Sequence, residues 1–224
     1  MWKDIHVIEK LSGCNSEKGK NIYKNKASTW PNDSVFGVLS NYIKSKKKTI
    51  DYLVCDDMGT EIADFIAIES SNKKIIYIHC KYNKSDTSAS TFEELCGQAM
   101  KNVRYIIESW NENNIYLQDR KSKWDIKWPY FGKDTDKSNK GKINRCIKGG
   151  SASEIFGMYK SISKDPECIY EVWLVHSGLS HSKLEAQLCK EAQEEHVPQL
   201  IWLLQATQDY ISDAGANLKI FCSQ

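Results

Sequence analysis

Residues 51–82 consist of apolar runs separated by short polar bends. The apolar runs are rich in β-branched and aromatic side chains, and the bends hold Asp-Met-Gly-Thr at 57–60 and a polar turn at 69–74. Runs of this composition, bounded by turn-forming residues, predict strands. We therefore expect a three-stranded antiparallel meander in this part of the chain.

Helical periodicity flanks the meander on both sides. Apolar positions between 35 and 43 recur at helical spacing behind Asp33 and Ser34, either of which can cap the first free amides. Between 92 and 107 the apolar residues recur at i, i+3, i+4 and i+7, which predicts a helix that covers the sheet. The expected order is therefore a helix, three strands and a second helix.

The second half of the chain predicts a central strand, then helices and a closing strand. Residues 168–176 are apolar on both faces apart from Glu171, which is typical of a strand in the middle of a sheet. Helices are expected over 183–195 and from Pro198 onward, and a short strand over 218–222. Residues 2–11 alternate loosely and predict a short strand or an arm. The fold class is thus α/β, with a central mixed sheet flanked by helices.

Charged and polar residues interrupt the predicted meander. Asp64 falls inside the second strand, and Glu61 precedes it by three residues. His79 and Lys81 lie two apart on the third strand, so they share one face of the sheet. Phosphodiester hydrolysis needs a cation, an activated water and a positive group near the developing charge, and these residues could provide such a site. The alternative is an ordinary cross-strand ion pair between Asp64 and Lys81.

This arrangement resembles the PD-(D/E)xK nuclease superfamily, which has the restriction-endonuclease-like fold. The resemblance implies that Asp64 binds a divalent metal and that Lys81 is the catalytic lysine. His79 stands where the family usually has an acid, and an imidazole suits Mn²⁺ better than Mg²⁺. Glu61 is the candidate third metal ligand. Gln98 matches a glutamine that points at the active site in several of these families.

The resemblance also implies a domain organisation and a partner. Residues 1–29 form an N-terminal arm, and 30–224 form a nuclease-like domain with a long insertion at about 111–165, before the fourth core strand. The run Gly-Thr-Glu-Ile-Ala-Asp-Phe-Ile, the later His-Cys-Lys-Tyr and a following Cys-Gly-Gln resemble nuclease-type domains attached to helicases in prokaryotic antiviral systems. The resemblance therefore implies a hydrolase, an endonuclease of antiviral defence or DNA processing, with DNA as substrate and a helicase or other defence subunit as partner.

The insertion is rich in glycine, lysine, serine and asparagine, and no long helical period persists in it. Basic residues interleaved with aromatic ones suit nucleic acid, because lysines meet phosphates and rings stack on exposed bases. The alternative is that the aromatic rings fix a long loop to the body of the protein. The candidate nucleic-acid contacts are Lys121, Lys123, Trp124 and Lys127.

Composition narrows the function classes. The net charge of the 224 residues is only +2, but lysines cluster within 10–48 and within 119–148, which favours one face that meets a polyanion. The eight cysteines form no Cys-x-x-Cys pair, and most lie in apolar runs, as in a reducing compartment. No signal pattern and no run of membrane-spanning length is present, so we expect a cytoplasmic protein without a membrane partner. Phosphate-loop, kinase, nucleophile-elbow and dinucleotide motifs are absent. Two alternatives to the nuclease stay open, namely a catalytically silent nucleic-acid-binding module and a protein-interaction domain.

Overall fold

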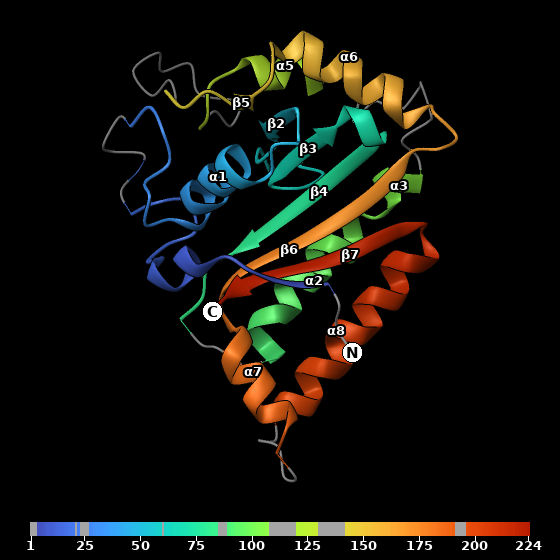
Figure 1. Cartoon of the computed structure of the whole chain (residues 1–224). Coiled ribbons are helices and arrows are strands. Elements are labelled where there is room, and N and C mark those ends of the chain that lie inside the picture. The colour runs from blue at the N-terminus through green and yellow to red at the C-terminus, as the bar shows by residue number, and fades with distance from the viewer. Residues whose placement is uncertain are drawn as a thin grey trace.

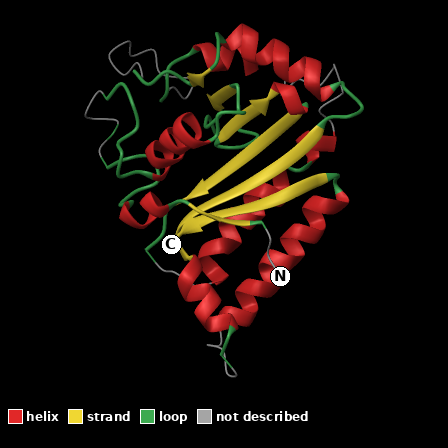
Figure 2. Ribbon diagram, in the orientation of Figure 1, coloured by secondary structure: helices red, strands yellow, loops and turns green. Residues whose placement is uncertain are grey.

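The computed structural model describes residues 4–20, 22, 27–59, 61–84, 89–107, 120–129, 142–190 and 196–224. Its centre is a seven-stranded mixed sheet with the strand order β1-β7-β6-β4-β3-β2-β5. Figure 2 shows this twisted sheet among helices, and Figure 1 labels the elements. The expected α/β architecture with a mixed sheet flanked by helices is confirmed. The strands are β1 (Ile5–Val7), β2 (Tyr52–Cys55), β3 (Phe65–Glu69), β4 (Lys74–Lys81), β5 (Cys146–Lys148), β6 (Ile169–Ser180) and β7 (Ala216–Ser223).

The predicted meander is present as β2, β3 and β4, which pair antiparallel in chain order. Strand β3 is buried along its whole length, because it lies between two strands and under helices on both faces. The sequence predicted Asp64 inside this strand, but the structure places it directly before the first strand residue, Phe65. The Asp64 side chain, in place of a backbone carbonyl of β3, accepts the hydrogen bond from the Cys80 amide of β4. The hydrogen-bond ladder between β3 and β4 therefore ends at this aspartate.

The other half of the sheet is parallel. Strand β4 pairs parallel with β6, and β6 pairs parallel with β7. The predicted strand at 168–176 is therefore central, as expected, although it continues to Ser180 through an irregularity in its pairing with β7. The Nδ1 atom of His176 accepts hydrogen bonds from the amides of Gly178 and Leu179, which satisfies backbone donors at this irregularity. Residues Ser177–Ser180 thus belong to β6.

Helices cover both faces of the sheet. On one face α1 packs into a core that also contains Trp30, Trp128 and the rings of Phe36 and Phe65. On the other face α2, α6 and α8 pack over the opposite side chains of the same strands. Among the described residues no helix is both long and apolar enough to cross a membrane. The helices are η1 (Glu9–Gly13), α1 (Val35–Lys46), η2 (Ser70–Asn72), α2 (Ala89–Asn102), α3 (Arg104–Ile107), α5 (Arg120–Asp125), α6 (Ala152–Ser163), α7 (His181–Leu188) and α8 (His196–Asp213).

The N-terminal residues belong to the sheet rather than to a separate arm. Strand β1 pairs parallel with β7 at the edge of the sheet. Leu11, in the short helix that follows, is completely buried in the core under α1. Of the two outcomes expected for residues 2–11, the short strand is therefore the one observed.

The insertion contains regular structure that the sequence analysis did not predict. Residues 111–119 and 130–141 of it lie outside the described residues, but the rest includes α5, β5 and the 12-residue helix α6. Ser151 and Glu154 form a capping box at the start of α6. The hydroxyl groups of Tyr159 in α6 and Tyr77 in β4 share a buried hydrogen bond of 2.8 Å. The prediction that the insertion lacks regular structure is therefore wrong for this part of the chain, which packs on the sheet.

Candidate functional site

A pocket of about 260 Å³ lies between the sheet and the helical segment α2–α3. One wall comes from the connection between β2 and β3 and from β4, and the other wall comes from α2 and α3. The pocket brings together four of the five predicted catalytic residues from separate parts of the chain. The lining residues are Gly59, Glu61, Asp64, His79, Gln98, Lys101, Asn102, Arg104 and Tyr105.

Asp64 is held at the floor of the pocket by the backbone of β4. Its Oδ2 atom accepts a hydrogen bond of 2.7 Å from the amide of Cys80. Burial raises the pKa of the Asp64 carboxyl well above its usual value, although this hydrogen bond opposes the shift. The carboxylates of Asp57 and Glu17 raise the pKa further, and the Lys18 ammonium lowers it. A cation in the pocket would favour the ionised form, so Asp64 is suited to bind one.

His79 faces the same pocket from β4 and makes no hydrogen bond to any described residue. Its side chain is 3% exposed, and burial lowers the pKa of the imidazole to about 4. The ring is therefore neutral at pH 7, which is the form that binds metals. The prediction that His79 and Lys81 share one face of the sheet is confirmed, because both side chains lie on the face that α2 covers.

Glu61 reaches the pocket from the connection between β2 and β3. The sequence analysis placed it three residues before Asp64, where a regular strand would turn it to the opposite face. Because β3 begins only at Phe65, the chain around Glu61 is free to bend inward, and Gly59 has a positive φ of 77°. The Oε2 atom of Glu61 is buried and has no hydrogen-bond partner among the described residues. An unsatisfied buried carboxylate oxygen is costly, and a bound cation would satisfy it.

Asp56 fixes the connection that carries Glu61 and Asp64. Its Oδ2 atom accepts from the amide of Ile62 at 2.8 Å, and its own amide donates to the carbonyl of Asp64 at 2.9 Å. Its Oδ1 atom accepts from Arg120 at 3.0 Å and from the Trp124 indole at 2.7 Å. Burial raises the pKa of Asp56 despite these partners, because the side chain has no exposed surface. The burial of this aspartate depends on α5, which is distant in sequence, so the local sequence pattern does not reveal it.

A second charged cluster lies beside Asp64. The ammonium of Lys18 lies 2.9 Å from Asp57 and 3.6 Å from Glu17. Burial lowers the pKa of Lys18, but the attraction of Asp57 and the other nearby carboxylates outweighs it, so the pKa is raised. Asp57 also accepts from the Trp128 indole at 2.8 Å. This cluster lies outside the lining of the pocket and connects the N-terminal residues to the β2 end.

The helical wall presents one polar face to the pocket. Gln98, Lys101, Asn102 and Tyr105 follow one another at i, i+3, i+4 and i+7. In α2 this spacing puts Gln98, Lys101 and Asn102 on one side of the helix, and Tyr105 of α3 lines the pocket next to them. Gln98 has no hydrogen-bond partner among the described residues, so its amide is available to a ligand. The sequence analysis found Gln98 by resemblance and missed the other three, although the helical spacing from Gln98 pointed to them.

Lys81 is the predicted catalytic residue that the structure does not place in the pocket lining. Its ammonium pairs with Glu94 of α2 at 2.5 Å. The two side chains are 24% and 58% exposed, and ion pairs at such exposure contribute about 0–1 kcal/mol. The alternative cross-strand pair between Lys81 and Asp64 is not observed, because Asp64 bonds to Cys80 instead.

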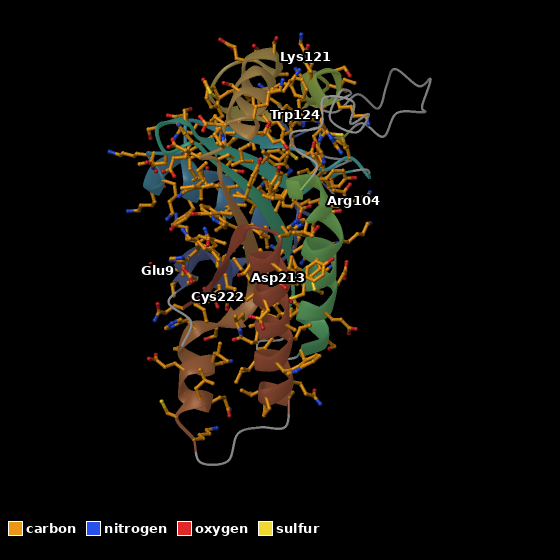
Figure 3. The ribbon with its side chains drawn as sticks, turned by 90° about the vertical axis from the view of Figure 1, so that its right-hand side faces the viewer. Glu9, Arg104, Lys121, Trp124, Asp213 and Cys222 are labelled. Carbon is orange, nitrogen blue, oxygen red and sulfur yellow. The ribbon has the colours of Figure 1, made fainter. Side chains whose placement is uncertain are left out.

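The residues predicted to contact nucleic acid lie in and after α5, away from the pocket lining. Lys121 and Lys127 are exposed, and Lys123 is half-buried. Trp124 is 1% exposed and holds Asp56, so its ring offers no face for stacking on a base, and this prediction is wrong. Figure 3 shows Arg104 at the upper end of the green helical segment, below the part that carries Lys121 and Trp124. The alternative, that the aromatic residues fix the insertion to the body, describes Trp124 and Trp128 correctly.

The donor atoms that could hold a metal are a carboxylate oxygen of Asp64, the free Oε2 atom of Glu61 and an imidazole nitrogen of His79. Among the described residues no three His, Cys, Asp or Glu side chains stand close enough to bind one ion together. Binding would therefore draw these side chains together. The mixture of oxygen and nitrogen donors fits Mn²⁺ or another transition metal better than Mg²⁺. All eight cysteines are free thiols, and none lines the pocket.

The chain matches no family model, no curated protein and no solved structure.

Proposed function

We propose that this protein is a metal-dependent phosphodiesterase that cleaves DNA in a restriction-endonuclease-like fold. The observation that carries the proposal is the pocket in which Asp64, Glu61, His79 and Gln98 meet. These residues come from the β2–β3 connection, from β4 and from α2. The resemblance to the nuclease superfamily assigns the same four residues to one site.

The order of elements also supports the proposal. Helix α1 precedes the meander β2–β3–β4, α2 follows it, and β6 then pairs parallel with β4 after a long insertion. This order agrees with the one expected for the nuclease core. His79 lies near the end of β4, as expected, whereas Asp64 lies directly before β3 rather than inside it.

Each residue has a defined role in the proposed reaction. Asp64, Glu61 and His79 hold the metal, Mg²⁺ or Mn²⁺, which supplies an activated water and neutralises phosphate charge when it is bound. Gln98 can donate its amide to a phosphate oxygen or orient the attacking water through a hydrogen bond. Prokaryotic defence or DNA processing, with a helicase or another defence subunit as partner, is part of the same proposal and rests on the resemblance alone.

Cleavage assays test this function. Supercoiled, linear and single-stranded DNA are incubated with Mg²⁺ and separately with Mn²⁺. We expect cleavage by the unaltered chain and a loss of at least 100-fold in Asp64→Asn, whose amide oxygen can still accept the Cys80 hydrogen bond. The matched control is Asp213→Asn, at an exposed acid at the end of α8. Equal cleavage by Asp64→Asn and the control would contradict the proposed site.

A catalytically silent DNA-binding module is the second candidate. The specific observation in its favour is the ion pair between Lys81 and Glu94, which leaves the lysine of the motif outside the pocket lining. Salt-dependent DNA binding without cleavage in either metal would favour this candidate, because neutralisation of phosphates gives a steep salt slope.

A further inference from the structure

The proposed reaction needs a positive group against the phosphate, and the motif lysine does not provide one inside the pocket. Charge develops on the phosphate oxygens in the transition state, and a fixed cation stabilises it. Lys81 is bound to Glu94 and does not line the pocket. The side chains of Glu61 and Asp64 bring only negative or neutral groups to the opposite wall. The structure must therefore supply the cation from elsewhere.

Lys101 lines the pocket from α2 and has no ion-pair partner among the described residues. It is exposed, so its ammonium keeps its hydration and its freedom to move until a ligand arrives. Gln98 lies one turn before it on the same helix face, and Tyr105 lies one turn after it. Lys101 thus lines the same pocket of about 260 Å³ as Asp64 and His79, from the helical wall opposite them.

The end of the helical wall adds a second positive group. The Arg104 guanidinium donates to the Tyr105 hydroxyl at 3.0 Å and stacks over the ring of Tyr105 at 4.9 Å from its centroid. These contacts hold Arg104 at the rim of the pocket. The pocket therefore has an acidic wall that suits a cation and a basic wall that suits a phosphate. Such an arrangement matches a phosphate bound on one side by a metal and on the other by side-chain donors.

We propose that Lys101 contacts the phosphate of the substrate and takes the role that the resemblance assigns to Lys81. This inference rests on the proposed function for its chemistry. Lys101 donates to a non-bridging phosphate oxygen, while Gln98 and Asn102 on the same face supply neutral donors. Lys81 acts only as the partner of Glu94 that fixes β4 to α2.

DNA binding tests the inference without any cleavage. Anisotropy of a labelled duplex is measured over a series of salt concentrations in Ca²⁺, a hard cation that carboxylates bind. We expect the slope of log K against log[salt] to fall by about one in Lys101→Ala, since one phosphate contact is lost. Two controls, Lys81→Ala and Lys44→Ala, should keep the slope of the unaltered chain. Lys44 is an exposed lysine in α1, on the opposite face of the sheet.

Cleavage of the same duplex in Mn²⁺ then assigns the catalytic role. We expect Lys101→Ala to lose at least 100-fold in kcat, Lys101→Arg to recover part of it, and Lys81→Ala to stay within a few-fold of the unaltered chain. Thermal melting checks that Lys101→Ala folds, which is expected because the side chain is exposed. Loss in Lys81→Ala with normal Lys101→Ala would overturn the inference and restore the role given by the resemblance.

The two proposals can fail separately. If the unaltered chain cleaves nothing in either metal, the proposed function fails, and the salt slope alone decides whether Lys101 contacts phosphate. If cleavage occurs and is lost in Asp64→Asn but not in Lys101→Ala, with an unchanged salt slope, the function stands and the inference on Lys101 is overturned.

Discussion

The carboxylate of Asp56 connects the insertion to the loop that carries the candidate site. It accepts from Arg120 and Trp124 on one side and from the amide of Ile62 on the other. Both Asp56 and Arg120 are almost completely buried, so removal of either side chain breaks a buried ion pair. Position within the chain gave no sign of this role, because the two residues are 64 apart.

Asp56→Asn should lower the free energy of unfolding by about 3–5 kcal/mol, the range for breaking a buried pair. Urea unfolding followed by circular dichroism measures the loss. The matched control is Asp125→Asn, at an exposed acid in the same segment, which should change stability by less than about 0.5 kcal/mol. A small effect of Asp56→Asn would mean that the loop is held by other contacts.

The buried histidine of β6 makes stability depend on pH. Burial, together with the nearby Lys81 ammonium, lowers the pKa of His176 to about 4. In the unfolded chain a histidine has a pKa of about 6.5, so below that pH the unfolded state takes up a proton that the folded state does not. The contribution of His176 to stability is therefore complete above pH 6.5 and is lost as the pH falls toward 4.

Between pH 6.5 and pH 4 we expect the free energy of unfolding to fall by up to roughly 3 kcal/mol more in the unaltered chain than in His176→Asn. Asparagine keeps a carbonyl oxygen that can accept the amides of Gly178 and Leu179. Comparison of the two chains by urea unfolding at several pH values isolates this histidine from the buried carboxyl groups. Parallel pH curves for the two chains would show that His176 does not titrate as described.

The sequence predicted best the positions of residues whose contacts in the fold are with residues close to them in the chain. Ser34 caps α1, as expected, with its Oγ accepting from the amide of Gly37 at 3.1 Å. Asp64 directly precedes β3 and His79 lies on the adjacent strand β4 of the same meander, so a short motif was enough to bring them together. Lys101 was missed although it follows Gln98 by one helical turn, whereas Arg104 lies in the separate helix α3, whose place at the pocket only the folded chain shows.

At the scale of elements, the largest error of the sequence analysis concerns the insertion. Helix α6 begins with Ser151 and Glu154, a capping signal that precedes apolar residues, and it could have been recognised. Helix α5 has only six residues, and its stability depends on the burial of Trp124. A short element of this kind has too few positions to show a helical period, so its prediction needs the partner surface.

Two helical glycines should respond in opposite directions to the same change. A Cβ atom added at Gly37 in α1 would overlap the carbonyl oxygen of Pro31, which is backbone and cannot move easily. A Cβ atom at Gly157 in α6 would meet no heavy atom within 4 Å. Alanine is normally more favourable than glycine in a helix interior by about 0.5–1 kcal/mol.

Gly157→Ala should therefore stabilise the protein by about 0.5–1 kcal/mol, whereas Gly37→Ala should destabilise it. Thermal and urea unfolding of both variants measure the difference, and each serves as the control for the other. Stabilisation in both would mean that α1 can shift away from Pro31 at little cost.

At the scale of the whole molecule, the pocket forms where three separately predicted parts meet. The connection before β3 brings Glu61 and Asp64, β4 brings His79, and α2 brings Gln98. None of these parts holds the pocket alone, so a ligand that binds there stabilises the packing of all three. Ligand binding to the folded state alone raises stability by RT ln(1 + [L]/Kd), which is about 2.7 kcal/mol at 100 times Kd.

Mn²⁺ should therefore raise the melting temperature of the unaltered chain by about 5–10 °C when it is saturating, given the usual shift per kcal/mol for a chain of this size. The shift should vanish in Asp64→Asn and shrink in His79→Gln, while Asp213→Asn and Lys101→Ala should keep it, because neither side chain is a proposed ligand. Because burial raises the pKa of Asp64 and a bound cation favours its ionised form, the shift should grow as the pH rises. An equal shift in Asp64→Asn would place the metal elsewhere on the protein. A different result would be that neither Mn²⁺ nor Mg²⁺ raises the melting temperature of the unaltered chain although DNA still binds. The acidic wall of the pocket would then hold no cation, and a catalytically silent DNA-binding module would account for the pocket better than a nuclease.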